Sequence, residues 1–450
     1  MKRQEHSRCS NVCSSLTDKC FGRGAMEREE VRELKCGMKL YSYKNPGLNG
    51  FYISLFLRAG SMYESERDSG ITHFLEHVAI RNVNALMSGR LYALLDRYGI
   101  EFNASTYSEM VHFYVSGASR NFKVGAEIIS KLFQPIALSA EDIRTECERI
   151  KAEIRENDER GSLVNFTSQV VHEGTTLARS ITGSASSISK ITKSRLENYR
   201  KSVFTGENLF LYVTGSFSDA DIDALASLID NAELGYGAAH LNIAPVSAGF
   251  FSREPRVYIK NADYTMVRFT FDMDMTKISV AESDLLYDIL LGGYNSRFFI
   301  EMSEREGLFY DLAGASERYK NIGTLAFYYE VKPSVLYTAV EKTLEILRSF
   351  VKEPPSDAEC MKAGYVDNAY MLYDDMRELN FTMAYDNHVL DAGYASLDER
   401  IAAYKGVSPE RISKIADMIF RPENLTLTVK GRKSKIDEGR LEALIRNFVK

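Results

Sequence analysis

The stretch GITHFLEHVAI, residues 70–80, places two histidines four residues apart with a glutamate directly before the second. On a helix, positions i, i+3 and i+4 share one face, so His73, Glu76 and His77 are predicted to project together. One interpretation is an ordinary polar helix face. The other is a zinc site, in which two neutral imidazoles and a carboxylate bind the metal and leave a position for water. The zinc interpretation requires a further ligand elsewhere in the chain.

A second helical stretch, TECERIKAEI at residues 145–154, offers that ligand. Glu146 and Glu153 are seven positions apart, which is close to two full helical turns, so the two carboxylates share a face. Glu153 would then be the third ligand, and Glu146 would support the ligands from behind. Alternatively, either acid belongs to a charged helix surface, since this stretch is rich in charge throughout.

Composition restricts the classes of protein to consider. The chain has 450 residues, enough for two or three domains, and a formal net charge of −6. Mild acidity argues against nucleic-acid binding, and no stretch approaches the ~20 continuous apolar residues of a membrane span. We therefore expect neither a nucleic-acid nor a membrane partner. Six cysteines in a chain of this length suit reduced thiols, and we expect a cytoplasmic protein.

The first 25 residues are basic, rich in serine and without the apolar centre of a secretory signal. We expect either a disordered extension or a start codon assigned too far upstream, in which case Met26 is the true first residue. An organelle transit peptide is a third option. Cys9, Cys13 and Cys20 could suggest a metal cluster, but their spacing matches no established metal motif.

From Met26 onward, strand and helix patterns alternate. Residues 38–61 read as a strand, an Asn/Pro/Gly turn and a second strand. Beyond the opening helix, the patterns predict further helices at 88–99, 121–132, 139–158 and 192–204, and strands at 101–119 and 208–217. Ser139 is the expected N-cap of its helix, because acidic residues follow in the first turn.

The second half repeats this order, which indicates a duplication. A shift of 208 positions superimposes Ser88, Arg97 and Gly99 on Ser296, Arg305 and Gly307. NLTLTVKG near the end also mirrors NLFLYVTG at the end of the first half. We predict an α+β fold of two duplicated α/β-sandwich domains, each a mainly antiparallel sheet packed with helices. The predicted boundaries are 26–233 for the first domain, 234–252 for a linker and 253–450 for the second domain. The second copy has LYDILLGG in place of HFLEHVAI, so only the first domain could hold the metal.

HxxEH is the signature of the inverted zincins, and the chain resembles the pitrilysin-like metallopeptidases. The resemblance is to the short two-domain branch that includes mitochondrial processing peptidases and many bacterial relatives. In that family a glutamate about 75 positions after the second histidine completes the zinc site, and Glu153 lies 76 positions after His77. The auxiliary glutamate of the family, seven positions earlier, falls on Glu146. The resemblance extends from about Met26 to Gly431 and includes FNAST at residues 102–106 and LARSITGS at 177–184.

The resemblance implies one Zn²⁺ per chain, held by His73, His77 and Glu153, with a peptide as substrate. Glu76 has the type and position of a general base that takes a proton from water and delivers it to the leaving amine. Glu146 would tune the metal environment. Asn103, Ala104, Ser105 and Thr106 would bind an extended peptide by main-chain hydrogen bonds, unless they merely cover a sheet edge.

The second half departs from the family pattern. Relatives carry an arginine seven residues before a tyrosine, a pair that helps to hold the substrate and the transition state. Tyr310 is retained here, but Ser303 occupies the arginine position, and neither Arg297 nor Arg305 has the right spacing. Tyr310 is therefore either a substrate-binding residue or a core aromatic.

Three functions remain open at this stage. The leading hypothesis is a zinc endopeptidase acting on extended peptides or unfolded segments, in peptide maturation or in leader or presequence removal. The second is a catalytically silent or scaffolding subunit, which normally loses part of HxxEH. The third is a peptide-binding protein with a structural zinc site, in which Glu76 would have no catalytic role. The intact metal set and the missing arginine together predict a heterodimer with an inactive homologue, ahead of a homodimer.

Overall fold

The computed structural model describes residues 28–160, 163–230, 232, 234–235, 237, 256–309, 312–352 and 358–448. The chain divides into two compact units. The N-terminal unit contains Glu29–Ser247 and also Leu372–Val389, and the C-terminal unit contains Ala248–Met371 and Leu390–Lys450. The predicted extension at 1–25, with its three cysteines, lies outside the described residues, as does most of the predicted linker at 234–252.

The N-terminal unit is built on a mixed sheet of six strands in the order β1-β2-β6-β3-β5-β4. Only the β2–β6 pair is parallel, so the sheet is mainly antiparallel, as predicted. Among the described residues, β4 pairs only with β5 and forms one edge of the sheet. The strands are β1 (Glu30–Glu33), β2 (Lys39–Lys44), β3 (Gly50–Leu57), β4 (Glu101–Thr106), β5 (Val111–Ala118) and β6 (Leu209–Gly215).

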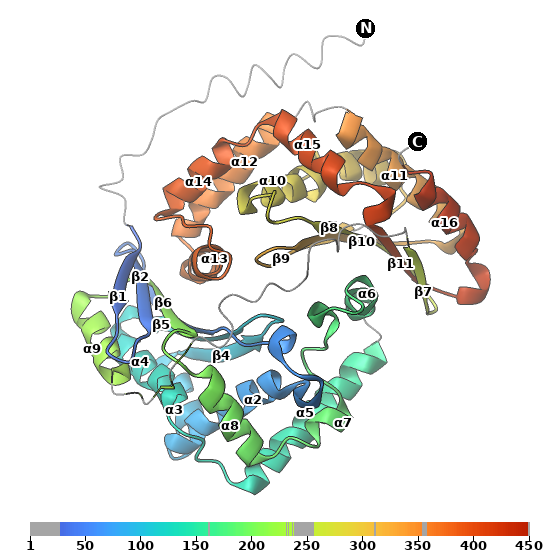
Figure 1. Ribbon diagram of the computed structural model, residues 1–450. Coiled ribbons are helices and arrows are strands. Elements are labelled where there is room, and N and C mark those ends of the chain that lie inside the picture. The colour runs from blue at the N-terminus through green and yellow to red at the C-terminus, as the bar shows by residue number, and fades with distance from the viewer. Residues whose placement is uncertain are drawn as a thin grey trace. The chain divides into compact units, whose positions relative to one another are not determined.

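Helices cover one face of this sheet (Figure 1). They are α2 (Ile71–Leu86), α3 (Leu91–Tyr98), α4 (Phe122–Ser130), α5 (Ala140–Arg160), α7 (Ala185–Ile188), α8 (Lys193–Val203) and α9 (Asp219–Ile229), and the same unit also contains α6 (Leu163–Val171). The core between sheet and helices is apolar, with Phe74 of α2, Ile150 of α5 and Leu196 of α8 packed in one cluster with the strands. Burial of this face is what fixes α2 and α5 side by side.

The opposite face of the sheet is covered by α13 (Met376–His388), although this helix lies more than 150 residues beyond β6 in the sequence (Figure 1). The contact is polar. Buried Asn380 donates to the carbonyl of Tyr212 at 2.9 Å and accepts from the hydroxyl of Ser54 at 2.6 Å. Ser54 also lies 2.8 Å from Nε2 of His112. Every buried polar group in this set has a partner, so the network fixes the position of α13 on the sheet.

The C-terminal unit has five strands in the order β7-β11-β8-β10-β9. They are β7 (Arg256–Asn261), β8 (Thr265–Met273), β9 (Leu312–Arg318), β10 (Gly323–Val331) and β11 (Leu425–Gly431). Its helices are α10 (Val280–Leu291), α11 (Leu336–Lys352), α12 (Ala358–Tyr370), α14 (Leu397–Lys405), α15 (Pro409–Ile419) and α16 (Glu438–Arg446), with a π-helical turn η6 (Phe299–Arg305). Among the described residues, no helix combines the length and apolar character needed to cross a membrane.

The two sheets confirm the predicted duplication. The order β2-β6-β3-β5-β4 in the first sheet recurs as β7-β11-β8-β10-β9 in the second, with one parallel pair at the same place in each. Asn208 donates to the carbonyls of Arg58 and Val203, and Asn424 makes the corresponding bonds at nearly the same distances. α10 takes the place of α2, and it contains no histidine.

One strand prediction was wrong. Residues 101–119 do not form a single strand but a hairpin, in which β4 and β5 pair antiparallel from Thr106 and Val111 outward. The turn is closed by a hydrogen bond from the backbone nitrogen of Tyr107 to the carbonyl of Met110 at 2.8 Å. No glycine or proline marks this turn, which is why the sequence pattern did not reveal it.

Candidate metal centre

The first turn of α2 is held by a carboxylate from outside the helix. Glu64 accepts hydrogen bonds from the backbone nitrogens of Gly70 at 2.7 Å and Thr72 at 2.9 Å, two of the donors that a helix start leaves unpaired. Burial raises the pKa of Glu64, and these hydrogen bonds oppose the rise. The negative charge also lies at the positive end of the helix dipole, which favours it there.

Two glycines allow the chain to pass close to this helix start. Gly70 has φ 88°, and a Cβ there would come within 2.6 Å of the carbonyl oxygen of Thr182. Gly183 has φ 68°, and a Cβ there would come within 2.5 Å of the carbonyl oxygen of Ser69. The segment LARSITGS therefore packs directly against the start of α2, and glycine is required on both sides of the contact.

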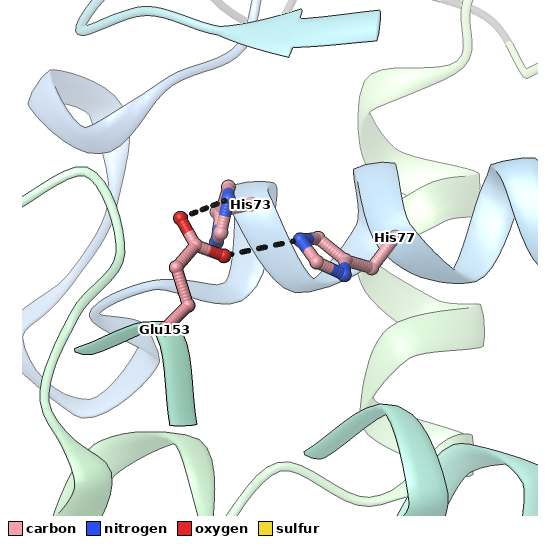
Figure 2. A group of neighbouring side chains, drawn as sticks. All are labelled: His73, His77 and Glu153. Atoms are coloured by element: carbon pink, nitrogen blue, oxygen red, sulfur yellow. Dashed lines mark ion pairs between the residues drawn. The ribbon is translucent and has the colours of Figure 1, made fainter. Parts of the chain in front are cut away.

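His73, His77 and Glu153 converge as the sequence predicts. Both histidines project from α2, and the Glu153 side chain on α5 points between their rings (Figure 2). Nε2 of His73 lies 3.8 Å from Oε1 of Glu153, and Nε2 of His77 lies 3.5 Å from Oε2. One ligand atom from each residue lies within 4.8 Å of the others, and no other group in the described parts of the chain meets this criterion.

These distances fit a shared zinc ion better than a direct bond. A charge-assisted N–H···O bond is usually ~2.7–2.9 Å long, whereas two ligands of a tetrahedral zinc at ~2.0–2.1 Å lie roughly 3.3 Å apart. His73 is buried, and no hydrogen bond to either ring nitrogen is present among the described residues. A structural core histidine would normally be hydrogen-bonded, so the polar-face interpretation does not account for His73.

The electrostatics prepare one imidazole as a neutral ligand. Burial, reinforced by the neighbouring His77, lowers the pKa of His73 to about 4, so its ring is neutral at physiological pH. Burial alone would lower the pKa of His77, but nearby carboxylates, above all Glu153, outweigh it and raise the pKa. The pKa of Glu153 is lowered, chiefly by its interaction with His77. A neutral imidazole beside an ionised carboxylate is the protonation state that a metal requires.

Glu146 lies beside His77, on the Nδ1 side of its ring. It is almost completely buried, and its Oε2 is 3.6 Å from Nδ1 of His77. Its other oxygen is bound by two arginines, Arg81 of α2 at 2.6 Å and Arg149 of α5 at 2.8 Å. Arg81 also binds Asp142 at 2.7 Å and so ties α2 to α5. Glu146 is therefore part of a buried charge network rather than of the solvated helix surface.

Glu76 faces the same site from α2 and is anchored by the edge strand. It is 8% exposed, and the Thr106 hydroxyl donates to its Oε2 at 2.5 Å. Burial raises the pKa of Glu76, and the Thr106 hydrogen bond opposes this. Thr106 is thus within reach of the predicted general base, a role that the sequence did not reveal.

The predicted substrate-binding residues lie together on β4, which is a free sheet edge. Asn103 and Ser105 are exposed, and Ala104 and Thr106 are partly buried on the helix side. Ser303 lies in η6, as does Arg305, which is bound to Glu301. Arg297 precedes η6 and is bound to Ser349. Tyr310 lies outside the described residues, so its assignment to substrate binding remains a prediction.

The sequence analysis did not identify two further residues that hold the site in place, Arg81 and Glu64. Arg81 is four residues after His77 and therefore on the same helix face, so the i, i+4 rule could have found it. Glu64 carries no such signal, because it reaches the start of α2 from an irregular segment.

The site brings His73, His77 and Glu153 together, with buried Glu76 beside them. This arrangement defines a zinc metallopeptidase of the inverted-zincin class. Residues 41–184 match the family described as "Insulinase (Peptidase family M16)", and residues 190–363 match "Peptidase M16 inactive domain". The chain belongs to the M16 family, in its two-domain short form.

Two of the similar proteins below cover most of the chain, and a third covers half of it. An uncharacterized zinc protease of Rickettsia felis is 24% identical over 400 residues, covering 86% of this chain and 91% of that protein. The beta subunit of the mitochondrial-processing peptidase of Lentinula edodes is 26% identical over 227 residues, covering 50% of this chain and 47% of that protein. The solved structure of a protease from Helicobacter pylori has a TM-score of 0.78 at 15% identity, covering 90% of this chain and 100% of that chain.

Proposed function

We propose that this zinc protease is an endopeptidase that cleaves extended peptides or unfolded segments. Peptide maturation and leader or presequence removal are the tasks that suit it. The observation that carries the proposal is the link from metal site to free strand, in which Thr106 at the end of β4 hydrogen-bonds Glu76 at 2.5 Å. A peptide that paired with β4 would therefore run directly past the general base and the metal ligands.

The chain supplies three functions at this site. His73, His77 and Glu153 would hold a zinc ion, which when bound acidifies water and polarises a peptide carbonyl. Glu76 would accept a proton from the water that attacks the carbonyl carbon, and would return it to the amine as the C–N bond breaks. Glu146, held by Arg81 and Arg149, would keep negative charge beside Nδ1 of His77 and so orient that ring.

Recognition would rest on the peptide backbone. Among the described strands β4 lies at the edge of its sheet, where an extended peptide can bind backbone N–H and C=O groups whatever its sequence. The N–H of Ala104 donates to the side-chain oxygen of Asn103 at 2.9 Å, so a bound peptide would replace that bond. This mode favours unfolded substrates, because a folded protein cannot present a free strand to the edge.

Metal-dependent cleavage tests the proposal. The purified protein is assayed on an unstructured peptide before and after chelation, and again after zinc is restored, with Glu76→Gln as a matched control. We expect cleavage that disappears with the metal and returns with it, and a Glu76→Gln protein that binds zinc but does not cleave. Zinc binding without cleavage by the wild type would instead favour a silent subunit.

We further propose that the active form is a heterodimer with a homologue that lacks HxxEH. The supporting observation is Ser303, which stands where the resemblance expects a substrate-binding arginine, while the metal set is intact. The similar protein of Lentinula edodes is itself named as a subunit. Cleavage and mass in solution are measured for the chain alone and with each available homologue. A fully active monomer that no homologue stimulates would refute the heterodimer.

A further inference from the structure

β4 has two faces with different surroundings. Phe102 and Ala104 pack against the core on the helix side, and Thr106 reaches Glu76 on that same side. Side chains alternate along a strand, so Asn103 and Ser105 point to the opposite face of the sheet. That face is the one covered by α13. A peptide paired with β4 alternates in the same way, and every second side chain would project toward α13.

An aromatic pair lies beside β4 on this face. Tyr107 directly follows the strand and is 40% exposed, and its ring centroid is 5.9 Å from that of Phe381 on α13. Burial raises the pKa of Tyr107, hydrogen bonding from Ser105 lowers it, and the negative charges of Glu378 and Glu76 raise it further. The ring contact places Tyr107 beside α13 at the end of β4, on the side of the strand where Asn103 and Ser105 are exposed.

Glu378 is the acid on α13. It precedes Phe381 by three residues, so the two side chains share one face of the helix. Glu378 is exposed, and no hydrogen bond or ion pair to its carboxylate is present among the described residues. Its neighbour Arg377 is bound to Glu101 at the start of β4, so that pair is already neutralised. The N-cap of α13 is Asp375, which accepts from the backbone nitrogens of Arg377 and Glu378.

The helix that carries these groups is fixed in place. Besides the Asn380 network, the carbonyl of Met376 accepts from the Thr214 hydroxyl at 2.6 Å, and Tyr385 donates to buried Glu109. Phe381 also packs on His112, with centroids 5.3 Å apart. Glu378 and Phe381 are thus held relative to β4 before any ligand arrives, which reduces the entropy lost on binding.

We propose that Tyr107, Phe381 and Glu378 form a subsite that selects a positively charged side chain of the peptide substrate. The proposal rests on the proposed function, since it assumes that a peptide pairs with β4. An arginine or lysine suits the three groups together. Its aliphatic stem would lie along the two rings, its cationic head can bind an aromatic face, and the head would reach the unpaired carboxylate. An acidic side chain at that position would be repelled by Glu378.

The test compares short unstructured peptides that differ at one position near the cleaved bond, with arginine, norleucine or glutamate there. The position is moved one residue at a time, so that both faces of β4 are sampled. We expect kcat/KM to be about 5-fold to 10-fold higher for arginine than for norleucine at alternate positions only. Glu378→Gln should reduce this ratio to near one, and Glu378→Lys should reverse it. Glu127→Gln, a matched loss of an exposed acid on α4, should preserve the ratio.

Peptide binding to Glu76→Gln protein separates this inference from the proposed function. Fluorescence anisotropy should show the same preference for arginine in that background, and the preference should disappear when Glu378→Gln is added. Cleavage without any preference would overturn the subsite and leave the endopeptidase intact. A binding preference without cleavage by the wild type would support the subsite and overturn the endopeptidase. A ratio unchanged by Glu378→Gln would assign the preference to other residues and refute the proposal.

Discussion

The hydrogen bond from Thr106 to Glu76 gives the sharpest test of how β4 serves the reaction. Thr106→Val keeps the size and branching of the side chain, so the pairing of residue 106 with Val111 and the strand preference are preserved. What disappears is a hydroxyl that donates to a carboxylate at 2.5 Å. Glu76 then remains buried with one oxygen unsatisfied and is free to turn away from the site.

The expected size follows from the bond that is lost. Hydrogen bonds to charged groups contribute ~1.5–3 kcal/mol, and each ~1.4 kcal/mol changes a rate by about tenfold. If the bond orients Glu76 in the transition state, kcat should fall by about 10-fold to 100-fold. Thr106→Ser retains the hydroxyl and should stay within about threefold of the wild type.

The assay follows kcat and KM on one peptide for the two variants, together with zinc content and thermal unfolding. We expect zinc to remain at one per chain in both, because Thr106 contacts none of the three predicted ligands. A merely structural role would lower activity in parallel with thermal stability and would not be rescued by serine. Unchanged kcat in Thr106→Val, or equal losses in both variants, would refute the positioning of Glu76 by β4.

Three further predictions concern the acids around the site and under α13. Glu76→Gln should retain zinc while hydrolysis falls by at least ~100-fold, and loss of the metal would instead make Glu76 a ligand. Glu153→Gln should weaken zinc binding more than Glu146→Gln does, since changes behind the ligands typically cost ~10–100-fold; measured affinities in the reverse order would exchange the two roles. Burial raises the pKa of Glu109 from 4.5 to about 7. A carboxyl whose pKa is raised on folding contributes stability below its unfolded pKa and loses it as the pH rises through the folded one. Wild-type stability should therefore fall by up to about 3 kcal/mol between pH 4.5 and 8 from this group alone, and urea unfolding of Glu109→Gln should lack that fall; parallel pH profiles for both proteins would contradict the assignment.

The grouping of His73, His77 and Glu153, with Glu146 nearby, could be predicted from sequence because each pair of side chains on one helix is fixed by local geometry. His73 and His77 share a face at i and i+4, and Glu146 and Glu153 share one across two turns. Neither relation depends on the rest of the fold. Bringing the two helices together needs only that both pack on the same sheet, which the apolar core ensures.

The surroundings of β4 could not be predicted in this way. The hairpin turn at Tyr107–Met110 contains neither glycine nor proline, so residues 101–119 were predicted as one strand instead of two. α13 docks through Asn380 and Ser54, buried polar groups 326 positions apart. No periodic sequence pattern predicts this hydrogen bond between Asn380 and Ser54, because the bond becomes favourable only once both side chains are desolvated together.

The central claim is that His73, His77 and Glu153 hold one zinc ion beside Glu76. Anomalous diffraction at the zinc absorption edge, from crystals of the zinc-loaded protein, measures this directly. The account predicts a single strong peak within ~2.0–2.2 Å of Nε2 of both histidines and of a Glu153 oxygen. Glu76 should lie beside the metal without binding it. A peak elsewhere in the chain, or Glu76 in place of Glu153 among the ligands, would contradict the account.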